Sequence, residues 1–157
     1  MTKYVDFIDA RLTPPRGDDC TMEENLEQLL RREGLLIESE MKLTDEIHYK
    51  YVLAVEGRAA ADRVYWQLFT GSVVIIPHSR WHVFASHNLM EPWVHYVPCR
   101  ADLSDLVDTL LWLRENDAEA EQIGRNGANF ARKYFTYDGV AYFLDRQLRT
   151  YAGKLQD

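Results

Sequence analysis

The sequence predicts an α/β fold in which helices flank a parallel β-sheet. Three short apolar runs rich in β-branched residues predict strands, and segments of helical composition separate them. These runs cover residues 49–55, 72–76 and 94–97. Strands that alternate with helices favour parallel pairing, and further helices are expected after the last strand. The pattern is typical of a Rossmann-like domain.

The N-terminal part mixes irregular and helical patterns. Residues 4–8 form a short apolar run that is compatible with a strand, and the prolines and glycine of residues 13–19 indicate a loop. Thr21 and Glu24 form a capping box, because the Thr21 hydroxyl can accept a hydrogen bond from the Glu24 amide. Three leucines follow on one helical face. We expect Gly34 to end this helix.

Residues 49–55 make the most convincing strand. Tyr49, Tyr51, Leu53 and Val55 share one face, and the alternate residues Val52 and Ala54 keep the other face apolar. Apolar residues on both faces are typical of a central strand covered on both sides.

The next elements alternate between helix and strand. Residues 59–69 have helical composition, and the β-branched run of residues 72–76 ends at Pro77. Residues 80–87 predict a short helix. Two prolines bracket the strand predicted at residues 94–97.

Three helices are predicted in the C-terminal third. Asp102 or Ser104 caps the first, which carries five leucine and valine residues. The second covers residues 117–134, and the third residues 138–153. We expect four apolar side chains of the third helix to enter the core. They are Val140, Phe143, Leu144 and Leu148.

Length and composition indicate one globular domain. The 157 residues can bury a sizeable core, and 46% hydrophobic and 27% charged residues are ordinary globular values. The formal net charge of −7 argues against a general nucleic-acid binder, which needs a basic face. A local basic pocket for a phosphate group remains compatible with this charge.

Neither the cysteines nor the N-terminal residues determine the cellular compartment of the protein. We interpret Cys20 and Cys99 as two free or buried thiols, with a single disulfide as the alternative. The first residues lack the pattern of a signal peptide, and no apolar run approaches the roughly 20 residues of a membrane span. We therefore expect a soluble chain.

Four ordered blocks between Lys50 and Pro98 resemble glycosyltransferase family 90. This is the capsule-associated, lipopolysaccharide-modifying family that includes the Rumi-type protein O-glucosyltransferases. The blocks are Lys50–Gly57, Ala59–Arg63, Gly71–Ile75 and Pro92–Pro98, and the tail at Asp102–Leu106, Glu115–Asp117 and Asn126–Gly127 continues them in register.

The resemblance implies one half of a two-lobed enzyme. Family members have a GT-B-like fold, and this chain is similar to the C-terminal, donor-binding lobe from about Ile8 to Tyr151. The resemblance implies a single Rossmann-like nucleotide-sugar-binding domain over residues 1–157. The N-terminal acceptor lobe, which supplies the family's catalytic aspartate, has no counterpart here. The resemblance therefore leaves the catalytic residue of this chain unknown.

The resemblance also assigns a donor site after the first strand. Arg63 stands where the family has an arginine that contacts the donor phosphates, although Ala61, Asp62 and Tyr65 depart from the usual serine and lysine around it. The alternative is a surface salt bridge from Arg63 to Asp62 or Glu56. The residues assigned to donor binding are Gly57, Ala60, Ala61, Asp62, Arg63, Val64 and Tyr65.

The remaining histidines and the tryptophans are expected to have structural roles. His78, His82 and His87 have poor spacing for a shared metal, so we predict no metal site. The family resemblance implies a UDP-sugar as donor substrate, and we predict no cofactor. His95 is expected to pack in a strand. The tryptophans are expected in the core, with stacking on a uracil ring as the alternative for one. They are Trp66, Trp81, Trp93 and Trp112.

The sequence is compatible with three functions. The first is transfer of a glucose- or xylose-type sugar from a UDP-sugar to a protein or glycan acceptor. It needs an acceptor lobe from a partner chain or from a longer product, so we predict little turnover by the isolated chain. The second is a non-catalytic nucleotide-sugar-binding or protein-interaction domain. The third is a structural α/β domain that serves oligomerisation, where exposed apolar surface would be covered by another copy.

Overall fold

The computed structural model describes residue 8 and residues 24–35, 42–57, 59–81 and 89–154. The chain forms two compact units, Met1–Asp45 and Glu46–Asp157, which are considered separately below. The single-domain interpretation stays a prediction. The loop at residues 13–19, the capping box, Cys20, and nearly all of both the strand predicted at residues 4–8 and the helix predicted at residues 80–87 lie outside the described residues.

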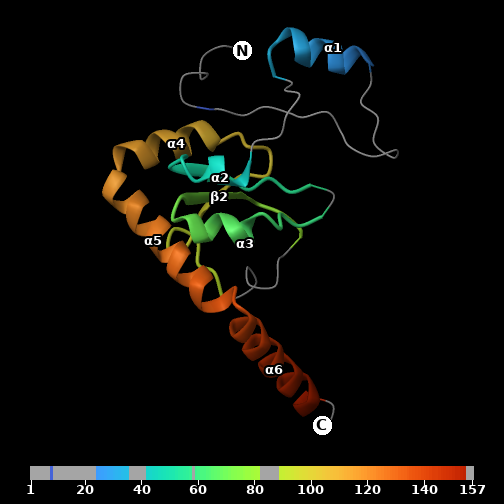
Figure 1. Cartoon of the computed structure of the whole chain (residues 1–157), viewed down its shortest axis with the longest axis vertical. Helices are drawn as coiled ribbons and strands as arrows, with labels where there is room; N and C mark the ends of the chain where they lie inside the picture. Colours follow the sequence, from blue (N-terminus) through green and yellow to red (C-terminus); the bar gives the residue numbers. More distant parts are fainter. Residues whose placement is uncertain (1–7, 9–23, 36–41, 58, 82–88, 155–157) are drawn as a thin grey trace. The chain divides into compact units, whose positions relative to one another are not determined.

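In the first unit, helix α1 (Glu24–Arg32) ends as the sequence predicts (Figure 1). Gly34 has a φ of +68°, and its amide donates to the Arg31 carbonyl at 3.1 Å. The amide of Leu35 donates to the Leu30 carbonyl at 2.8 Å. This pair of bonds is a Schellman motif, which satisfies two carbonyls that the helix end would leave free. The short helix α2 (Leu43–Glu46) spans the boundary between the units.

The second unit contains a three-stranded parallel sheet, which confirms the predicted α/β class. The strands are β1 (Tyr51–Leu53), β2 (Val73–Pro77) and β3 (Val97–Cys99), in the order β1-β2-β3. Val52 aligns with Val74, and Ile75 aligns with Val97. The sheet is compatible with a Rossmann-like fold; the likeness to a GT-B enzyme stays a prediction.

The middle strand of the described sheet is β2, and the central position predicted for residues 49–55 stays a prediction. Val73, Val74 and Ile75 are all buried, because neighbouring elements cover both faces of β2. The third strand begins later than predicted. Val94 and His95 form a turn between the bridge partners Pro92 and Tyr96, so the strand predicted at 94–97 is wrong in its first three positions.

The predicted helix at residues 59–69 is shorter in the structure. It begins only at α3 (Val64–Gln67) and continues as the 3-10 turn η1 (Leu68–Thr70). Gly71, with a φ of 83°, ends it. Strand β2 then begins at Val73, so only Gly71 and Ser72 separate the helical segment from the strand.

The bounds of the three C-terminal helices match the prediction closely, but the N-cap of the first is Asp105 and not the predicted Asp102 or Ser104. The helices are α4 (Leu106–Glu115), α5 (Asp117–Tyr134) and α6 (Tyr137–Lys154). Helix α5 packs on β2 and η1, and its residues Phe130 and Ala131 join the main apolar cluster. The buried members of that cluster are Val52, Ala54, Val64, Leu68, Val74, Met90, Phe130 and Ala131.

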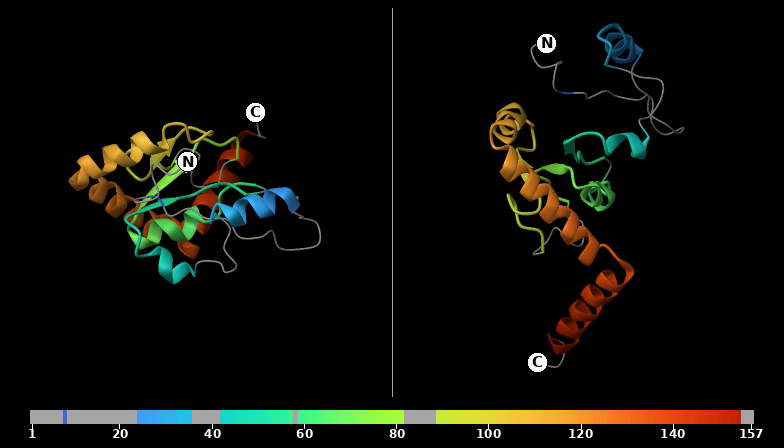
Figure 2. Two further views of the ribbon diagram at one scale, coloured as in Figure 1. Left: turned by 90° about the horizontal axis from the view of Figure 1, so that it is seen from above. Right: turned by 60° about the vertical axis from the view of Figure 1, so that its left-hand side comes forward.

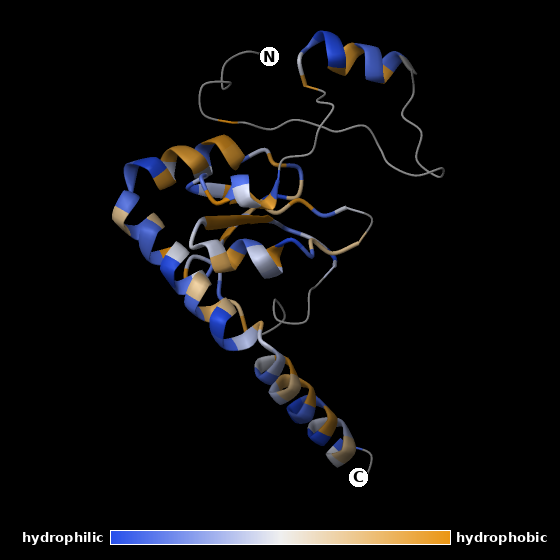
Figure 3. Cartoon of the chain, in the orientation of Figure 1, coloured by the Kyte–Doolittle hydropathy of each residue, from blue (hydrophilic) through white to orange (hydrophobic). Residues whose placement is uncertain are grey.

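Helix α6 leaves the end of α5 and extends away from the sheet, as Figure 1 and the right-hand view of Figure 2 show. It has no buried residue, and Leu144 and Leu148 are 52% and 66% exposed. The prediction that these leucines enter the core is therefore wrong. Apolar and polar bands alternate along α6, whereas β2 is apolar throughout (Figure 3). None of the helices in the described ranges is both long and apolar enough to cross a bilayer.

Candidate functional site

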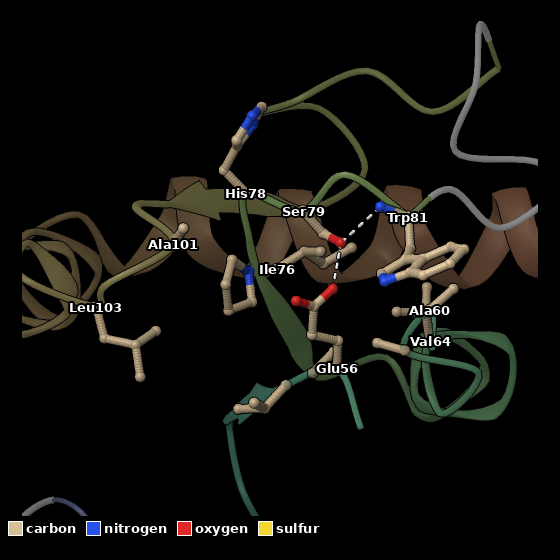
Figure 4. Close-up of a pocket in the computed structure, with 13 residues that line it drawn as sticks. Glu56, Ala60, Val64, Ile76, His78, Ser79, Trp81, Ala101 and Leu103 are labelled. Atoms are coloured by element: carbon tan, nitrogen blue, oxygen red, sulfur yellow. Dashed lines mark hydrogen bonds between the residues drawn. The ribbon is translucent and has the colours of Figure 1, made fainter. Parts of the chain in front are cut away.

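A cavity of about 120 Å³ opens at the carboxyl ends of the parallel strands (Figure 4). Segments that follow β1, β2 and β3 form its walls together with the start of α3. This is the edge where open α/β sheets bind ligands, since the loops that leave neighbouring strands converge there. Its lining residues are Ala54, Val55, Glu56, Ala60, Ala61, Val64, Ile76, Pro77, His78, Ser79, Trp81, Ala101 and Leu103.

The polar part of this cavity is a connected group of three residues. The Ser79 hydroxyl donates a hydrogen bond to Oε2 of Glu56, and it accepts one from the backbone N–H of Trp81 at 2.9 Å. Glu56 follows β1 and Ser79 follows β2, so their contact joins the ends of adjacent strands. Figure 4 shows the carboxylate and the hydroxyl turned toward each other.

The apolar part of the cavity lies beside the polar group. Small or branched side chains of Ala60, Val64 and Ile76 form this wall. The Trp81 ring lies next to Ala60 and Val64 in Figure 4 and is 48% exposed. The Arg80 guanidinium lies 5.4 Å from the centre of the Trp81 ring, a cation–π contact that orients the indole.

Three of the seven residues assigned to donor binding line this cavity: Ala60, Ala61 and Val64. Gly57 is exposed and has open space where a Cβ would stand. Tyr65 is half-buried and packs edge-on against Phe135, with ring centres 4.9 Å apart. Tyr65 therefore contributes to packing behind the site.

Asp62 and Arg63 are exposed and stand between the lining residues Ala61 and Val64 in the chain. The Arg63 guanidinium has no hydrogen bond or ion pair within the described part of the chain, so the alternative of a salt bridge to Asp62 or Glu56 is not seen there. Its charge is available to a ligand that extends from the cavity.

The backbone amides at the start of α3 are already engaged. The amide of Val64 donates to the Ala61 carbonyl at 3.3 Å, and that of Tyr65 donates to the Asp62 carbonyl at 3.1 Å. A phosphate near α3 would therefore rely on the Arg63 side chain more than on the amides of Val64 and Tyr65.

The sequence reasoning missed Glu56, Ser79 and Trp81 as site residues. Glu56 directly precedes Gly57, and Ser79 stands two residues beyond the end of β2. Polar residues at these positions share an edge whenever two strands are parallel and adjacent. Polar residues did follow both predicted strands in the sequence. They could be recognised as one site only if β1 and β2 were known to be paired.

Other candidate residues lie in packing roles or at the surface. The His95 ring lies 4.9 Å from Phe130, and its Nδ1 accepts from the Glu91 amide, so it packs in a turn instead of a strand. Trp81 and Trp93 are 48% and 46% exposed, which corrects their predicted core positions. Trp93 packs edge-on against half-buried Trp112.

Two further features of the described residues are the Cys99 thiol and the grouping of possible metal ligands. Cys99 is a buried free thiol at the end of β3, and burial raises its pKa to about 11. Such a thiol is protonated at neutral pH and is a poor nucleophile. Across the residues that the structure describes, no three His, Cys, Asp or Glu side chains gather as metal ligands.

Comparison with known proteins identifies relatives of the sequence. The model of "Glycosyl transferase family 90" matches residues 8–157. Protein O-glucosyltransferase 2 of Danio rerio is 36% identical over 108 residues, which are 69% of this chain and 21% of that protein. Human protein O-glucosyltransferase 1 is 31% identical over 113 residues, 72% of this chain and 29% of its own length.

A viral protein is similar to the same degree. Uncharacterized protein 027R of Frog virus 3 is 39% identical over 106 residues, 62% of this chain and 10% of that protein. The chain thus spans less than a third of each of these relatives. The match over nearly all residues confirms the resemblance predicted from the four sequence blocks: the chain belongs to glycosyl transferase family 90.

Proposed function

We propose that this chain forms the donor-binding part of a glycosyltransferase that moves a sugar from a UDP-sugar to a protein or glycan acceptor. The observation that carries the proposal is the cavity at the carboxyl edge of the parallel sheet in a family 90 chain. Loops at this edge are where α/β folds bind nucleotides. Two similar proteins are named protein O-glucosyltransferases, which favours glucose or a related sugar such as xylose.

Arg63 is the proposed contact for the diphosphate. When the sugar leaves, negative charge grows on the UDP leaving group, and a forked guanidinium can stabilise that charge through paired hydrogen bonds. Arg63 is exposed, and the cavity-lining residues Val64 and Ala61 lie one and two positions from it in the sequence. It can therefore meet a diphosphate at the mouth of the cavity while the rest of the donor lies inside.

The acceptor site and the catalytic base are proposed to come from polypeptide outside the matched segment, in a longer product or a partner chain. Matches that cover 21% and 29% of the O-glucosyltransferases support this division, because most of each relative has no counterpart here. We expect the chain alone to bind donor and to transfer sugar slowly or not at all.

Titration calorimetry tests the binding step. UDP, UDP-glucose and UDP-xylose are each titrated into the 157-residue chain, with ADP as the control nucleotide. We expect saturable heat with the uridine ligands and weaker or no binding of ADP. If none of the uridine ligands binds, the proposal is overturned. The structural α/β domain then remains as the interpretation.

A second candidate function is a non-catalytic nucleotide-sugar-binding domain. It is favoured by the short coverage of the relatives. Among the described lining residues, Glu56, His78 and Ser79 carry the side chains that could act as a base or nucleophile. Release of UDP from UDP-glucose, measured with acceptor proteins and with the chain expressed beside its upstream or partner sequence, separates the two functions. Release that appears only with the added sequence supports the transferase.

A further inference from the structure

We propose that the Glu56–Ser79 pair is a receptor for a vicinal diol, so that one sugar ring of the donor lies in the cavity with two neighbouring hydroxyls on the Glu56 carboxylate. This inference rests on the proposed function, because it assumes that the donor enters this cavity. The ring can be the ribose of the nucleotide or the transferred sugar, and both present the same chemistry.

The pair is fixed by its place in the sheet. Glu56 stands three residues after β1 and Ser79 two residues after β2, and these strands are parallel neighbours. Their side chains therefore leave the same edge of the sheet and meet at the cavity, as Figure 4 shows. The contact bridges 23 positions of sequence and depends on the folded sheet.

The hydrogen bonds orient the carboxylate. Ser79 gives its hydroxyl proton to Oε2 of Glu56 and accepts the amide proton of Trp81, so the hydroxyl is held from both sides. The second oxygen, Oε1, makes no hydrogen bond with any residue in the described ranges, and in Figure 4 it faces the space between the lining side chains. An oriented carboxylate with free lone pairs accepts hydrogen bonds and donates none.

The charge of Glu56 selects the kind of group that can bind. An anionic phosphate is repelled by a carboxylate, whereas neighbouring hydroxyls can donate to its two oxygens together. The diphosphate is then expected on the side of Arg63, whose positive charge lies outside the cavity. This division places one sugar ring inside and the phosphates at the rim.

The remaining walls suit the carbon faces of a sugar ring. Ala60, Val64 and Ile76 offer apolar contact, and Arg80 holds the Trp81 indole beside them. The volume of about 120 Å³ is below the ~300–1,000 Å³ of complete small-molecule sites. The cavity therefore accommodates a single ring of the donor.

The experiment measures whether the affinity contributed by the ligand hydroxyls depends on the Glu56 carboxylate. Wild type, Glu56→Gln and Glu56→Ala are titrated with UDP, 2′-deoxy-UDP, 3′-deoxy-UDP and UDP-glucose. Glu119→Gln, an exposed carboxylate on α5, is the matched control. Thermal melts verify that each variant is folded. A hydrogen bond to a charged group corresponds to about a tenfold change in affinity or more.

If the ribose diol binds Glu56, wild type should lose about tenfold in affinity for either deoxy-UDP, and the Glu56 variants should bind UDP and the deoxy ligands alike. If the transferred sugar binds there, UDP-glucose should bind wild type about tenfold better than UDP, and the variants should lose that advantage. Either result supports the diol receptor and identifies its source.

Ser79→Ala keeps the carboxylate but removes its anchor. We expect a smaller loss than with Glu56→Ala, restricted to the ligands that carry the relevant hydroxyls. Variants of Glu56 that retain wild-type affinity for all four ligands would overturn the inference, although UDP binding itself would still support the proposed function. If wild type binds none of them, both proposals fail together.

Discussion

The carbonyl oxygen of Gly71 lies 2.3 Å from the position that a Cβ atom would take at Gly124. Helix α5 can therefore approach the turn after η1 only because Gly124 has no side chain. We expect Gly124→Ala to lower the free energy of unfolding by about 1–3 kcal/mol, since the helix must move away from a backbone atom. Urea unfolding followed by circular dichroism measures the change.

Gly153→Ala is the control for this prediction. Gly153 lies in α6, with nothing within 4 Å of its added Cβ. Alanine favours a helix over glycine by about 1 kcal/mol, so the control should be neutral or stabilising. Equal destabilisation by both variants would contradict the close packing of α5.

Two leucines of α4 differ sharply in burial. Leu113 has 0% exposed surface, whereas Leu111 is 43% exposed. We expect Leu113→Ala to cost about 2–5 kcal/mol through lost apolar contact and a cavity, and Leu111→Ala to cost much less. Paired urea titrations compare the two. Similar losses would mean that α4 is turned differently on its neighbours.

The Arg63 side chain is the proposed phosphate contact. We expect Arg63→Ala to weaken binding of UDP at least tenfold, because a bidentate charge-assisted pair is lost. Arg132→Ala removes an exposed arginine of α5 and should leave binding unchanged. Calorimetry with UDP and with uridine separates the contribution of the phosphates to affinity from that of the nucleoside. The affinity for uridine should not depend on Arg63. Unchanged UDP affinity in the Arg63 variant would exclude this contact.

The Cys99 thiol is predicted to be unreactive in the native state. Burial raises its pKa from 9.0 to about 11, so the thiolate is scarce at neutral pH. In a Cys20→Ser background, a thiol reagent at pH 8 should label Cys99 slowly in the folded chain and fast in urea. A native rate equal to the unfolded rate would contradict this burial.

The same shift has a consequence for stability at high pH. Because the folded pKa lies above the unfolded one, the unfolded chain loses this proton first as the pH rises. The contribution of Cys99 to stability is therefore complete below about pH 9 and declines between pH 9 and 11. Cys99→Ala should reduce that alkaline decline in urea titrations at pH 8 and pH 10.

Asp145 and Arg149 form an i,i+4 pair on α6, with 2.7 Å between Oδ2 and Nε. The hydrogen bond from Arg149 lowers the pKa of Asp145 below 3.8. The pair thus supports the helix at a pH above the unfolded pKa, and this support is lost as the pH falls through the lowered value. Carboxyl NMR should show the Asp145 pKa rising toward 3.8 in Arg149→Gln.

The sequence predicted elements best where local signals and packing agree. Helix α5 has Asp117 and Glu119 in its first turn and basic residues in its last, and its bounds match the prediction. The third strand was misplaced because Trp93 adopts a φ of 62° in a turn between Pro92 and Tyr96, and side-chain alternation carries no signal for such a turn.

The site was harder to predict than the fold. An apolar stripe has the same period whether or not it is covered, so Leu144 and Leu148 were assigned to the core although they are exposed. The family resemblance indicated Arg63 as a phosphate contact. The contact between Glu56 and Ser79 forms only because β1 and β2 are neighbours. Long-range pairing of this kind leaves no local pattern.

Helix α6 relies on its own backbone hydrogen bonds and local side-chain pairs, since none of its residues is buried. Its amide protons should exchange with solvent orders of magnitude sooner than those of the enclosed strand β2. The helix can consequently unravel and re-form without opening the sheet, which makes it an independent cooperative segment at the carboxyl end of the described chain.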